Sequence, residues 1–210
     1  FVMDIDQVVA RISSKLEAEG MLDNTLIIFS SDNGAYWPAE EILLHGHDSN
    51  KGSRGQKGDV WNGGHRVPLI ISWPSGIKKS NTYKGLVSLT DIYATLASLT
   101  GKRIPAGEGI DSKDFGPVLA GDMSFTTREN MVHHSSGGMF AIREGDWKYI
   151  DGLGSGGFTY PFKINPEENG PEGQLYQLNQ DPLETTNLFE AFPEKIIRMK
   201  EKLEALKRAK

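Results

Sequence analysis

Apolar residues recur along the chain with two different periods, which predict helices near both ends and strands between them. Residues 3–19 carry apolar side chains at helical spacing, and Gly20 is suited to end that helix. Residues 25–30 form an almost unbroken apolar run, as is typical of a strand covered on both faces of a parallel sheet. Residues 67–73 predict a second strand and residues 90–99 a short helix. A helix followed by a buried strand indicates α/β layering.

The pattern changes after about residue 125, where shorter strands replace the long apolar run. Gly145-Asp146 lies between two of these strands and indicates a hairpin turn. Pro193 can begin a final helix whose apolar side chains fall on one face. We therefore expect a larger α/β part over residues 1–125 and a small antiparallel sheet with a packed helix over residues 126–210. The strands predicted in this second part lie at residues 131–134, 139–143, 147–150 and 174–178.

Composition excludes several classes of function. The chain has 210 residues, with 23 Lys and Arg against 28 Asp and Glu, which gives a formal net charge of −5. A general nucleic-acid binder would carry a basic excess instead. The chain contains no cysteine, so it can form no disulfide, cysteine zinc site or thiol nucleophile. No apolar run approaches the roughly 20 residues that a membrane span needs.

Ser31-Asp32-Asn33-Gly34 directly follows the first apolar strand and offers oxygen ligands. Ligands of open α/β sheets bind at the carboxyl ends of strands. The Asp32 carboxylate and the Asn33 amide oxygen suit a hard cation such as Ca²⁺. The same tetrapeptide also fits a simple Asx turn that ends at Gly34, and the residues alone leave both interpretations open.

The stretch from residue 31 to residue 66 is polar, rich in glycine and too long for an ordinary connection, which favours a functional loop. Positive charge gathers in its second half, where only Asp48 and Asp59 oppose it. Such a cluster on a net-acidic chain indicates an anion site, although a solvated loop with scattered ion pairs is the alternative. The cations are Lys51, Arg54, Lys57 and Arg66, and the histidines are His45, His47 and His65.

His133 and His134 form a third candidate. Paired histidines can bind a metal or act as acid and base. In the simpler alternative, one ring packs inside the protein and the other faces solvent.

Several segments, taken together and in order, resemble type I sulfatases of the alkaline phosphatase superfamily. The first runs from Asn24 to Gly34, and the second is the block from Arg54 to Pro68 followed by Trp73-Pro74. The likeness extends across nearly the whole chain and matches the C-terminal half of such enzymes. The remaining segments are Ala141-Ile142-Arg143-Glu144-Gly145-Asp146-Trp147-Lys148-Tyr149, Leu175-Tyr176-Gln177-Leu178, Asp181-Pro182-Leu183-Glu184 and Asn187-Leu188.

The resemblance implies a fold and a set of roles. Residues 1–125 would be the C-terminal part of an alkaline-phosphatase-like α/β sandwich domain, and residues 126–210 a small α+β subdomain. Asp32 and Asn33 would ligate one calcium ion, and Lys57 would contact the sulfate group at the catalytic centre. Five further residues would bind the substrate or support its pocket, with the choice between the two adjacent histidines left open. They are Arg54, His47, His65, His133 and His134.

The chain also departs from the family pattern. Asn62 stands where relatives usually carry Glu before Gly-Gly, which puts the local loop geometry in doubt. The early acidic metal-binding pair is absent, as is the C-x-P-x-R or S-x-P-x-R motif whose Cys or Ser becomes formylglycine. We therefore expect the nucleophile in a missing N-terminal half, and we expect this chain alone to be incomplete and inactive. An incomplete sheet exposes an apolar strand edge, so the isolated chain should associate with that half or with itself.

The expected function is hydrolysis of sulfate monoesters, with sulfated carbohydrates among the candidate substrates. Two alternatives remain: a phosphodiester or phosphonate hydrolase of the same superfamily, and a non-catalytic module that binds sulfated glycans through residues 45–66. The expected partners are a sulfate ester and the missing half of the same enzyme, without nucleic acid or a membrane span. The family implies a periplasmic or secreted protein.

Overall fold

The computed structural model describes residues 2–208, which form two compact units. The first unit comprises residues 2–30 and 68–128, and the second comprises residues 31–67 and 129–208. Residues 31–67 thus group with the C-terminal part of the chain, although the sequence pattern places them with residues 1–125. The domain boundary near residue 125 stays a prediction.

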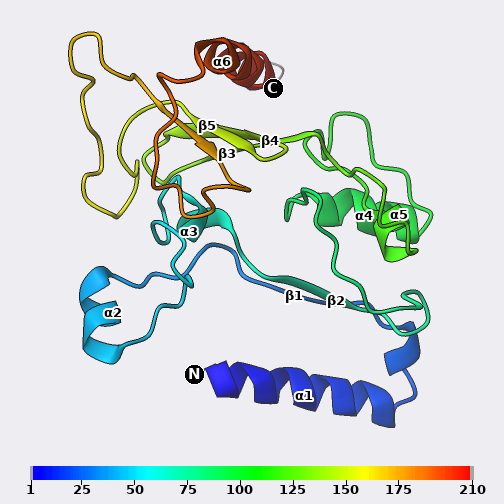
Figure 1. Cartoon of the computed structure of the whole chain (residues 1–210). Coiled ribbons are helices and arrows are strands. Elements are labelled where there is room, and N and C mark those ends of the chain that lie inside the picture. Colours follow the sequence, from blue (N-terminus) through cyan, green and yellow to red (C-terminus); the bar gives the residue numbers. More distant parts are fainter. Residues whose placement is uncertain (1, 209–210) are drawn as a thin grey trace. The chain divides into compact units, whose positions relative to one another are not determined.

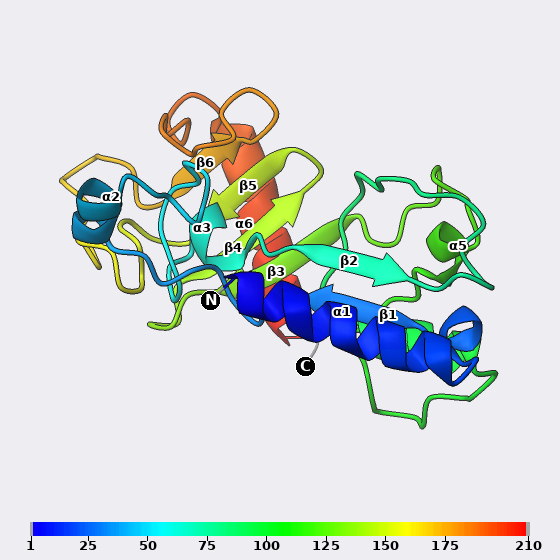
Figure 2. The same ribbon diagram turned by 90° about the horizontal axis from the view of Figure 1, so that it is seen from below.

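The first unit begins with the predicted helix, α1 (Val2–Ala18), followed by the short 3-10 turn η1 (Leu22–Asn24). Strands β1 (Ile27–Ser30) and β2 (Leu69–Ser72) then pair with each other. Both predicted strands are confirmed in position. Figures 1 and 2 show α1 running alongside this pair of strands.

The expectation of a buried parallel strand at residues 25–30 is wrong in two respects. The two strands are antiparallel, with Ile28 opposite Ile71. No residue of either strand is buried, and Ile70 is 61% exposed. The apolar run encodes a strand that needs covering, but within residues 2–208 little chain covers it. Whether a strand is covered depends on segments distant in the sequence, so the apolar run alone does not predict it.

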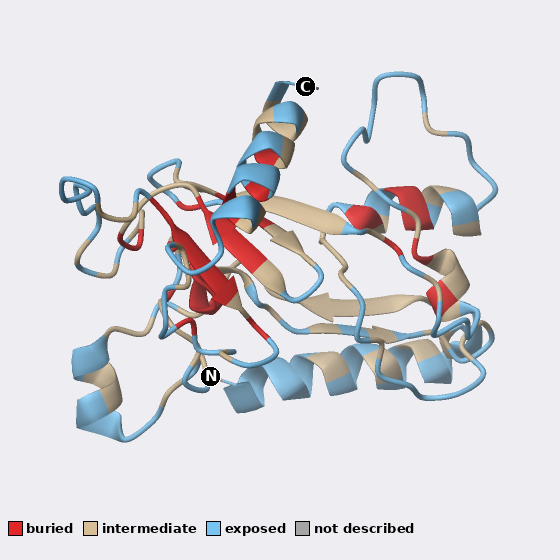
Figure 3. Ribbon diagram, turned by 45° about the horizontal axis from the view of Figure 1, so that its top comes forward, coloured by how far each residue is buried: buried red, intermediate tan, exposed pale blue. Residues whose placement is uncertain are grey.

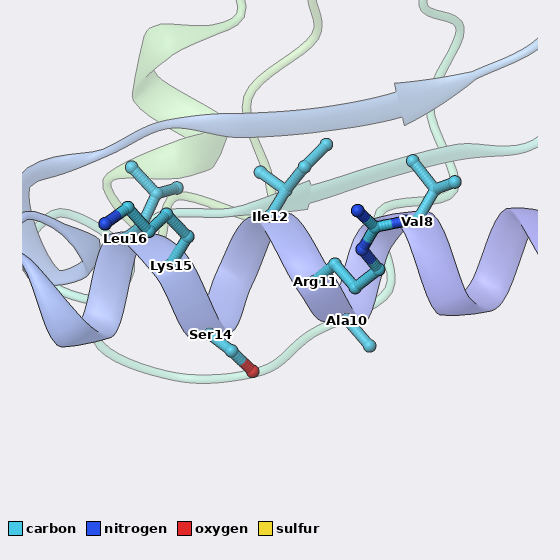
Figure 4. Close-up of a pocket in the computed structure, with 7 residues that line it drawn as sticks. All are labelled: Val8, Ala10, Arg11, Ile12, Ser14, Lys15 and Leu16. Atoms are coloured by element: carbon cyan, nitrogen blue, oxygen red, sulfur yellow. The ribbon is translucent and has the colours of Figure 1, made fainter.

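The apolar side chains along one face of α1 are also exposed to solvent. Val8, Ile12 and Leu16 point toward the two strands, whereas Ala10 and Ser14 point away from them (Figure 4). Nevertheless α1 has no buried residue, and Ile12 is 52% exposed. An amphipathic helix gains most of its stability by burying such a stripe, so α1 leaves much of that gain unrealised.

Two further helices complete the first unit. Helix α4 (Asp91–Leu99) was predicted, and the short α5 (Gly116–Leu119) was not. The buried Asp91 accepts hydrogen bonds from the backbone N–H groups of Ser88 and Lys113, each at 2.8 Å, and pairs with Arg128. This buried carboxylate therefore ties the start of α4 to two later segments.

The second unit is built on the four-stranded antiparallel sheet that the sequence predicts. The strands are arranged in the order β3-β4-β5-β6, and helix α6 (Pro193–Arg208) lies over one face (Figure 1). The hairpin turn at Gly145-Asp146 is confirmed, since Glu144 pairs with Trp147 across it. The strands are β3 (Asn130–His134), β4 (Phe140–Glu144), β5 (Trp147–Ile150) and β6 (Gln174–Gln177).

Both faces of this sheet are covered. Side chains alternate between the faces of a strand, so neighbouring residues enter different clusters. Ile142, Tyr149 and Leu175 pack against α6, whereas Ala141, Ile150 and Tyr176 pack with Val60 and Trp61 from the glycine-rich segment. Figure 3 shows this buried core in β4, β5 and α6, while α1 carries none.

The glycine-rich segment contains two short helices that the sequence pattern did not predict. They are α2 (Ala39–His45) and α3 (Asn62–His65). Residues 151–172 are irregular apart from an isolated bridge between Leu153 and Ile164. No helix among residues 2–208 is both long enough and apolar enough to cross a membrane.

Candidate active site

The segment that follows β1 is clasped by the glycine-rich loop. The Gly34 N–H donates to the Gly64 carbonyl at 2.9 Å, and the Lys57 N–H donates to the Ala35 carbonyl at 3.0 Å. A Cβ on Gly34 would lie 1.7 Å from the Gly63 carbonyl oxygen, so only glycine permits this approach. The clasp brings the backbone of Lys57 next to the segment that carries Asp32 and Asn33.

Asn50 reinforces the clasp with its side-chain amide. Its Oδ1 accepts from the Ala35 N–H at 3.2 Å, and its Nδ2 donates to the Gly55 carbonyl at 3.2 Å. The Lys57 side chain itself is exposed. The backbone of Lys57 is thus held by hydrogen bonds, while its ammonium, a compact point charge suited to an anion, belongs to an exposed side chain.

Asp32 and Asn33 fit part of a calcium site. Asp32 is exposed. The Asn33 Nδ2 donates to the Gly34 carbonyl at 3.1 Å, so the Oδ1 of Asn33 is the atom of this amide that could ligate a cation. Calcium takes six to eight oxygen ligands. The part of the chain that the structure describes contains no group of three or more acidic or histidine side chains placed to hold a metal. These two residues could therefore supply only a portion of a calcium shell.

His65 and His133 come together in the second unit. Their ring centroids lie 4.2 Å apart, and the His133 Nε2 lies 3.1 Å from the Val60 carbonyl oxygen. Burial and the nearby Lys148 charge lower the pKa of His65 to about 4. The same causes, with His65 itself, lower the pKa of His133 well below its usual range. Both imidazoles are therefore neutral at pH 7.

The two other candidate histidines lie at the surface. His134 is exposed, and its ring lies 5.4 Å from the ring of Phe140. His47 is exposed beside Trp37, with 6.0 Å between the ring centroids. Of the adjacent pair, His133 is thus the ring that turns inward. Any contact of these histidines with substrate stays a prediction.

Arg54 is engaged inside the second unit. Its Nη1 donates to the Glu184 carbonyl at 2.6 Å and to the Tyr176 hydroxyl at 3.0 Å. The guanidinium also lies 3.8 Å from the ring centre of Trp61. These contacts are compatible with a supporting role, and the choice between substrate binding and support of the pocket stays a prediction for Arg54.

A buried ion pair, which sequence reasoning missed, supports the start of α3. Lys148 Nζ lies 2.7 Å from Glu184 Oε1, and both side chains are almost fully buried. Glu184 Oε2 accepts from the Asn62 N–H at 2.6 Å, and Lys148 Nζ donates to Asn62 Oδ1 at 3.4 Å. A carboxylate at a helix start satisfies an N–H group that lacks a partner within the helix. Glu184 therefore supplies a carboxylate to the start of α3, where the chain itself carries Asn62.

The sequence contains a signal for one residue of the buried ion pair, Lys148, but none for the other, Glu184. Lys148 stands within the predicted strand of residues 147–150, where an inward lysine requires an acidic partner. Glu184 gave no local signal, because its contact with Asn62 spans 122 residues.

Asp59 was also missed as a structural residue. It is fully buried and accepts from the backbone N–H groups of Gln56 at 2.9 Å, Phe158 at 2.6 Å and Thr159 at 3.0 Å. It therefore fastens the 151–172 loop to the loop that carries Lys57.

Several known proteins are similar to this chain in sequence. The sulfatase family model matches residues 1–102. The N-acetylgalactosamine-6-O-sulfatase of Bacteroides thetaiotaomicron is 32% identical over 98% of this chain and 41% of its own length. The mouse steryl-sulfatase is 34% identical over 68% of this chain and 23% of its own length.

A solved structure has the same fold over almost the whole chain. It comes from work on the metabolism of multiple glycosaminoglycans by Bacteroides thetaiotaomicron, with a TM-score of 0.83 and 32% identity. The alignment covers 97% of this chain and 43% of that one. The chain thus spans about two-fifths of the proteins that it matches most fully. It has an α/β sulfatase fold, and it belongs to the sulfatase family.

Proposed function

We propose that this chain is part of an enzyme that hydrolyses sulfate monoesters, with sulfated carbohydrates as substrates. The observation that carries the proposal is the clasp between residues 33–35 and the glycine-rich loop. It joins an oxygen-ligand pair to an exposed lysine through backbone hydrogen bonds of 2.9 and 3.0 Å. A relative that aligns with 98% of this chain acts, by its name, on a sulfated sugar.

Each residue of the clasp has a role in the proposal. Asp32 and Asn33 hold part of the coordination shell of a calcium ion, which polarises sulfate oxygens when bound. Lys57 places its positive charge beside the sulfate and stabilises the negative charge that develops during cleavage of the ester bond. The neutral His65 and His133 offer hydrogen bonds without adding a competing charge.

In this proposal, the remaining catalytic residues belong to a part of the enzyme outside this chain. Relatives extend well beyond the matched region, and the nucleophile, a formylglycine, belongs to the N-terminal part of the enzyme. That part is also the proposed partner of this chain, and export to the periplasm or outside the cell is the proposed location. The chain alone is then expected to be inactive.

The experiment compares sulfate and phosphate esters as substrates of the full-length protein. We expect sulfate hydrolysis that a calcium chelator abolishes and that Lys57→Met lowers by about 10²–10³-fold in kcat. Asp32→Ala should raise the calcium concentration needed for activity. Lys51→Met, which removes an exposed cation of the same loop, is the matched control.

Two results would contradict the proposal. Preferential hydrolysis of phosphate diesters or phosphonates would move the protein to another branch of the superfamily. Saccharide binding without turnover by the full-length protein would make it a binding module.

A further inference from the structure

Four exposed aromatic side chains lie on the segment that follows β1 and on the 151–172 loop, which Asp59 fastens to the loop that carries Lys57. Neither the clasp nor the core uses them. Tyr160 is 82% exposed and Phe158 47% exposed. Isolated exposed apolar residues are ordinary, but several rings gathered at one place mark a binding surface. We call this group the aromatic rim, and it consists of Tyr36, Phe158, Tyr160 and Phe162.

The rings form two edge-to-face pairs. The centroids of Tyr36 and Phe158 lie 6.1 Å apart with an interplanar angle of 81°, and those of Tyr160 and Phe162 lie 5.8 Å apart at 88°. These geometries are the ones that aromatic pairs prefer. Each pair therefore holds its rings at a set angle while leaving ring surface open to solvent.

Backbone contacts hold the first pair next to Lys57. The Lys57 N–H binds the carbonyl of Ala35, the residue before Tyr36. On the other side, a Cβ on Gly58 would lie 3.3 Å from the Phe158 ring. Three separate segments of the second unit thus converge on one lysine.

Two exposed lysines lie close to rim residues along the chain. Lys57 and Lys163 are both exposed, and residues 154–164 include no acidic residue. Asp59 is fully buried and occupied by backbone N–H groups, and the exposed Asp32 is the acid that the proposed function assigns to calcium. The rim therefore combines open aromatic faces with positive charge and suits a ligand that is anionic and has apolar faces.

A polar group beneath the rim lacks a partner. Gln56 is 9% exposed, and its Nε2 donates to the Thr159 hydroxyl at 3.3 Å. Its Oε1 is buried and has no hydrogen-bond partner among residues 2–208. A buried acceptor without a donor is costly, and a ligand hydroxyl would satisfy it.

We propose that the aromatic rim binds the sugar rings of a sulfated oligosaccharide and so sets the substrate class of the Lys57 site. A pyranose presents C–H groups on its faces and hydroxyls at its edge, which matches open rings beside polar groups. Two separate ring pairs favour at least two sugar units over a monosaccharide. The inference rests on the proposed function for its placement of the sulfate at Lys57.

The test measures binding, so it does not depend on turnover. The probes are a chondroitin 6-sulfate tetrasaccharide and its desulfated form, titrated by calorimetry into the 210-residue chain. The desulfated form is also titrated into the full-length protein, which cannot cleave it. We expect Phe158→Ala and Tyr160→Ala each to weaken both probes by about tenfold.

Control variants separate stacking from charge and from folding. Phe158→Tyr keeps the ring and should bind within twofold of the parent. Lys57→Gln should weaken the sulfated probe alone, and added salt should do the same. Tyr93→Ala removes an exposed tyrosine of α4, in the first unit, and should leave both affinities unchanged.

The inference fails if removing a rim ring leaves both affinities unchanged, or if neither protein binds either probe. It also fails if the rim variants lose affinity for 4-nitrophenyl sulfate but not for the saccharides, because the rim would then hold an apolar group. The proposed function is judged separately, by sulfate release from the full-length protein.

Discussion

The two units contain amphipathic elements of similar kind but differ in how much of the apolar surface they bury. In the second unit, α6 contributes Ile196, Met199 and Leu203 to a closed core against the sheet. In the first unit, α1 has the same amphipathic pattern, yet no residue of it is buried. Helix pattern alone therefore does not show whether a helix is stabilised, because the partner surface decides.

The contrast indicates how the chain is stabilised. The second unit carries a core on each face of its sheet and a buried ion pair beneath the clasp. The first unit presents α1 and the edges of β1 and β2, which are expected to be covered by the remainder of a full-length sulfatase. The predictions below test this contrast, beginning with the largest expected effect.

Removing one partner of the buried ion pair should cause the largest loss. Lys148→Met leaves Glu184 as a buried, unpaired carboxylate, and such losses cost about 3–5 kcal/mol. Urea denaturation of the 210-residue chain measures this cost. Lys202→Met, which breaks a more exposed pair with Glu144, is the matched control and should cost less than about 1 kcal/mol. Equal losses in the two variants would contradict the assignment.

Opening a cavity in the core of the second unit should cost somewhat less. Leu203 is fully buried, and truncation of such a leucine costs about 2–5 kcal/mol. Leu203→Ala should lower the midpoint of urea unfolding accordingly. An effect below about 1 kcal/mol would show that α6 is not docked as described.

The neutral histidine pair should make stability depend on pH. The pKa of His65 falls from its ordinary 6.5 to about 4 in the folded protein. Between these values the unfolded chain binds more protons, so the free energy of unfolding falls as pH drops from 6.5 to 4. The loss should reach up to about 3 kcal/mol. Denaturation at pH 7 and pH 4.5 measures it, and His65→Asn should flatten the dependence.

The smallest effect is expected in α1. Ile12→Ser removes an apolar side chain that is already 52% exposed, so the 210-residue chain should change by less than about 0.5 kcal/mol. The same substitution should reduce self-association in sedimentation experiments. In the full-length protein it should cost more than 1 kcal/mol, because the stripe would then be covered. A large loss in the shorter chain would abolish the contrast between the units.

Local signals explain what the sequence could predict. Gly145-Asp146 encoded a hairpin, and the apolar spacing after Pro193 encoded a helix, because both depend on neighbours within a few residues. Asp32, Asn33 and Lys57 were identified as candidates by short motifs, and their proposed roles remain predictions. The clasp that joins them required three-dimensional structure.

Long-range properties explain what the sequence could not predict. The burial of residues 25–30 was misjudged, because an apolar run does not show whether other segments cover it, and little of residues 2–208 does so. Glu184 was missed for the same reason, since its residue type and local sequence resemble those of many surface acids. Helix α3 escaped prediction because two of its four residues are glycine, which ordinarily disfavours helices.

The contacts of Glu184 also determine when, during synthesis of the chain, the loop around Lys57 can complete its folding. A ribosome releases the chain from its N-terminus, so the loop around Lys57 emerges long before residue 184. Yet Arg54 and Asn62 bind Glu184 across 130 and 122 residues. Contacts of such separation form late, after much of the chain has collapsed. The proposed sulfate-binding loop therefore completes these contacts only after residue 184 has emerged.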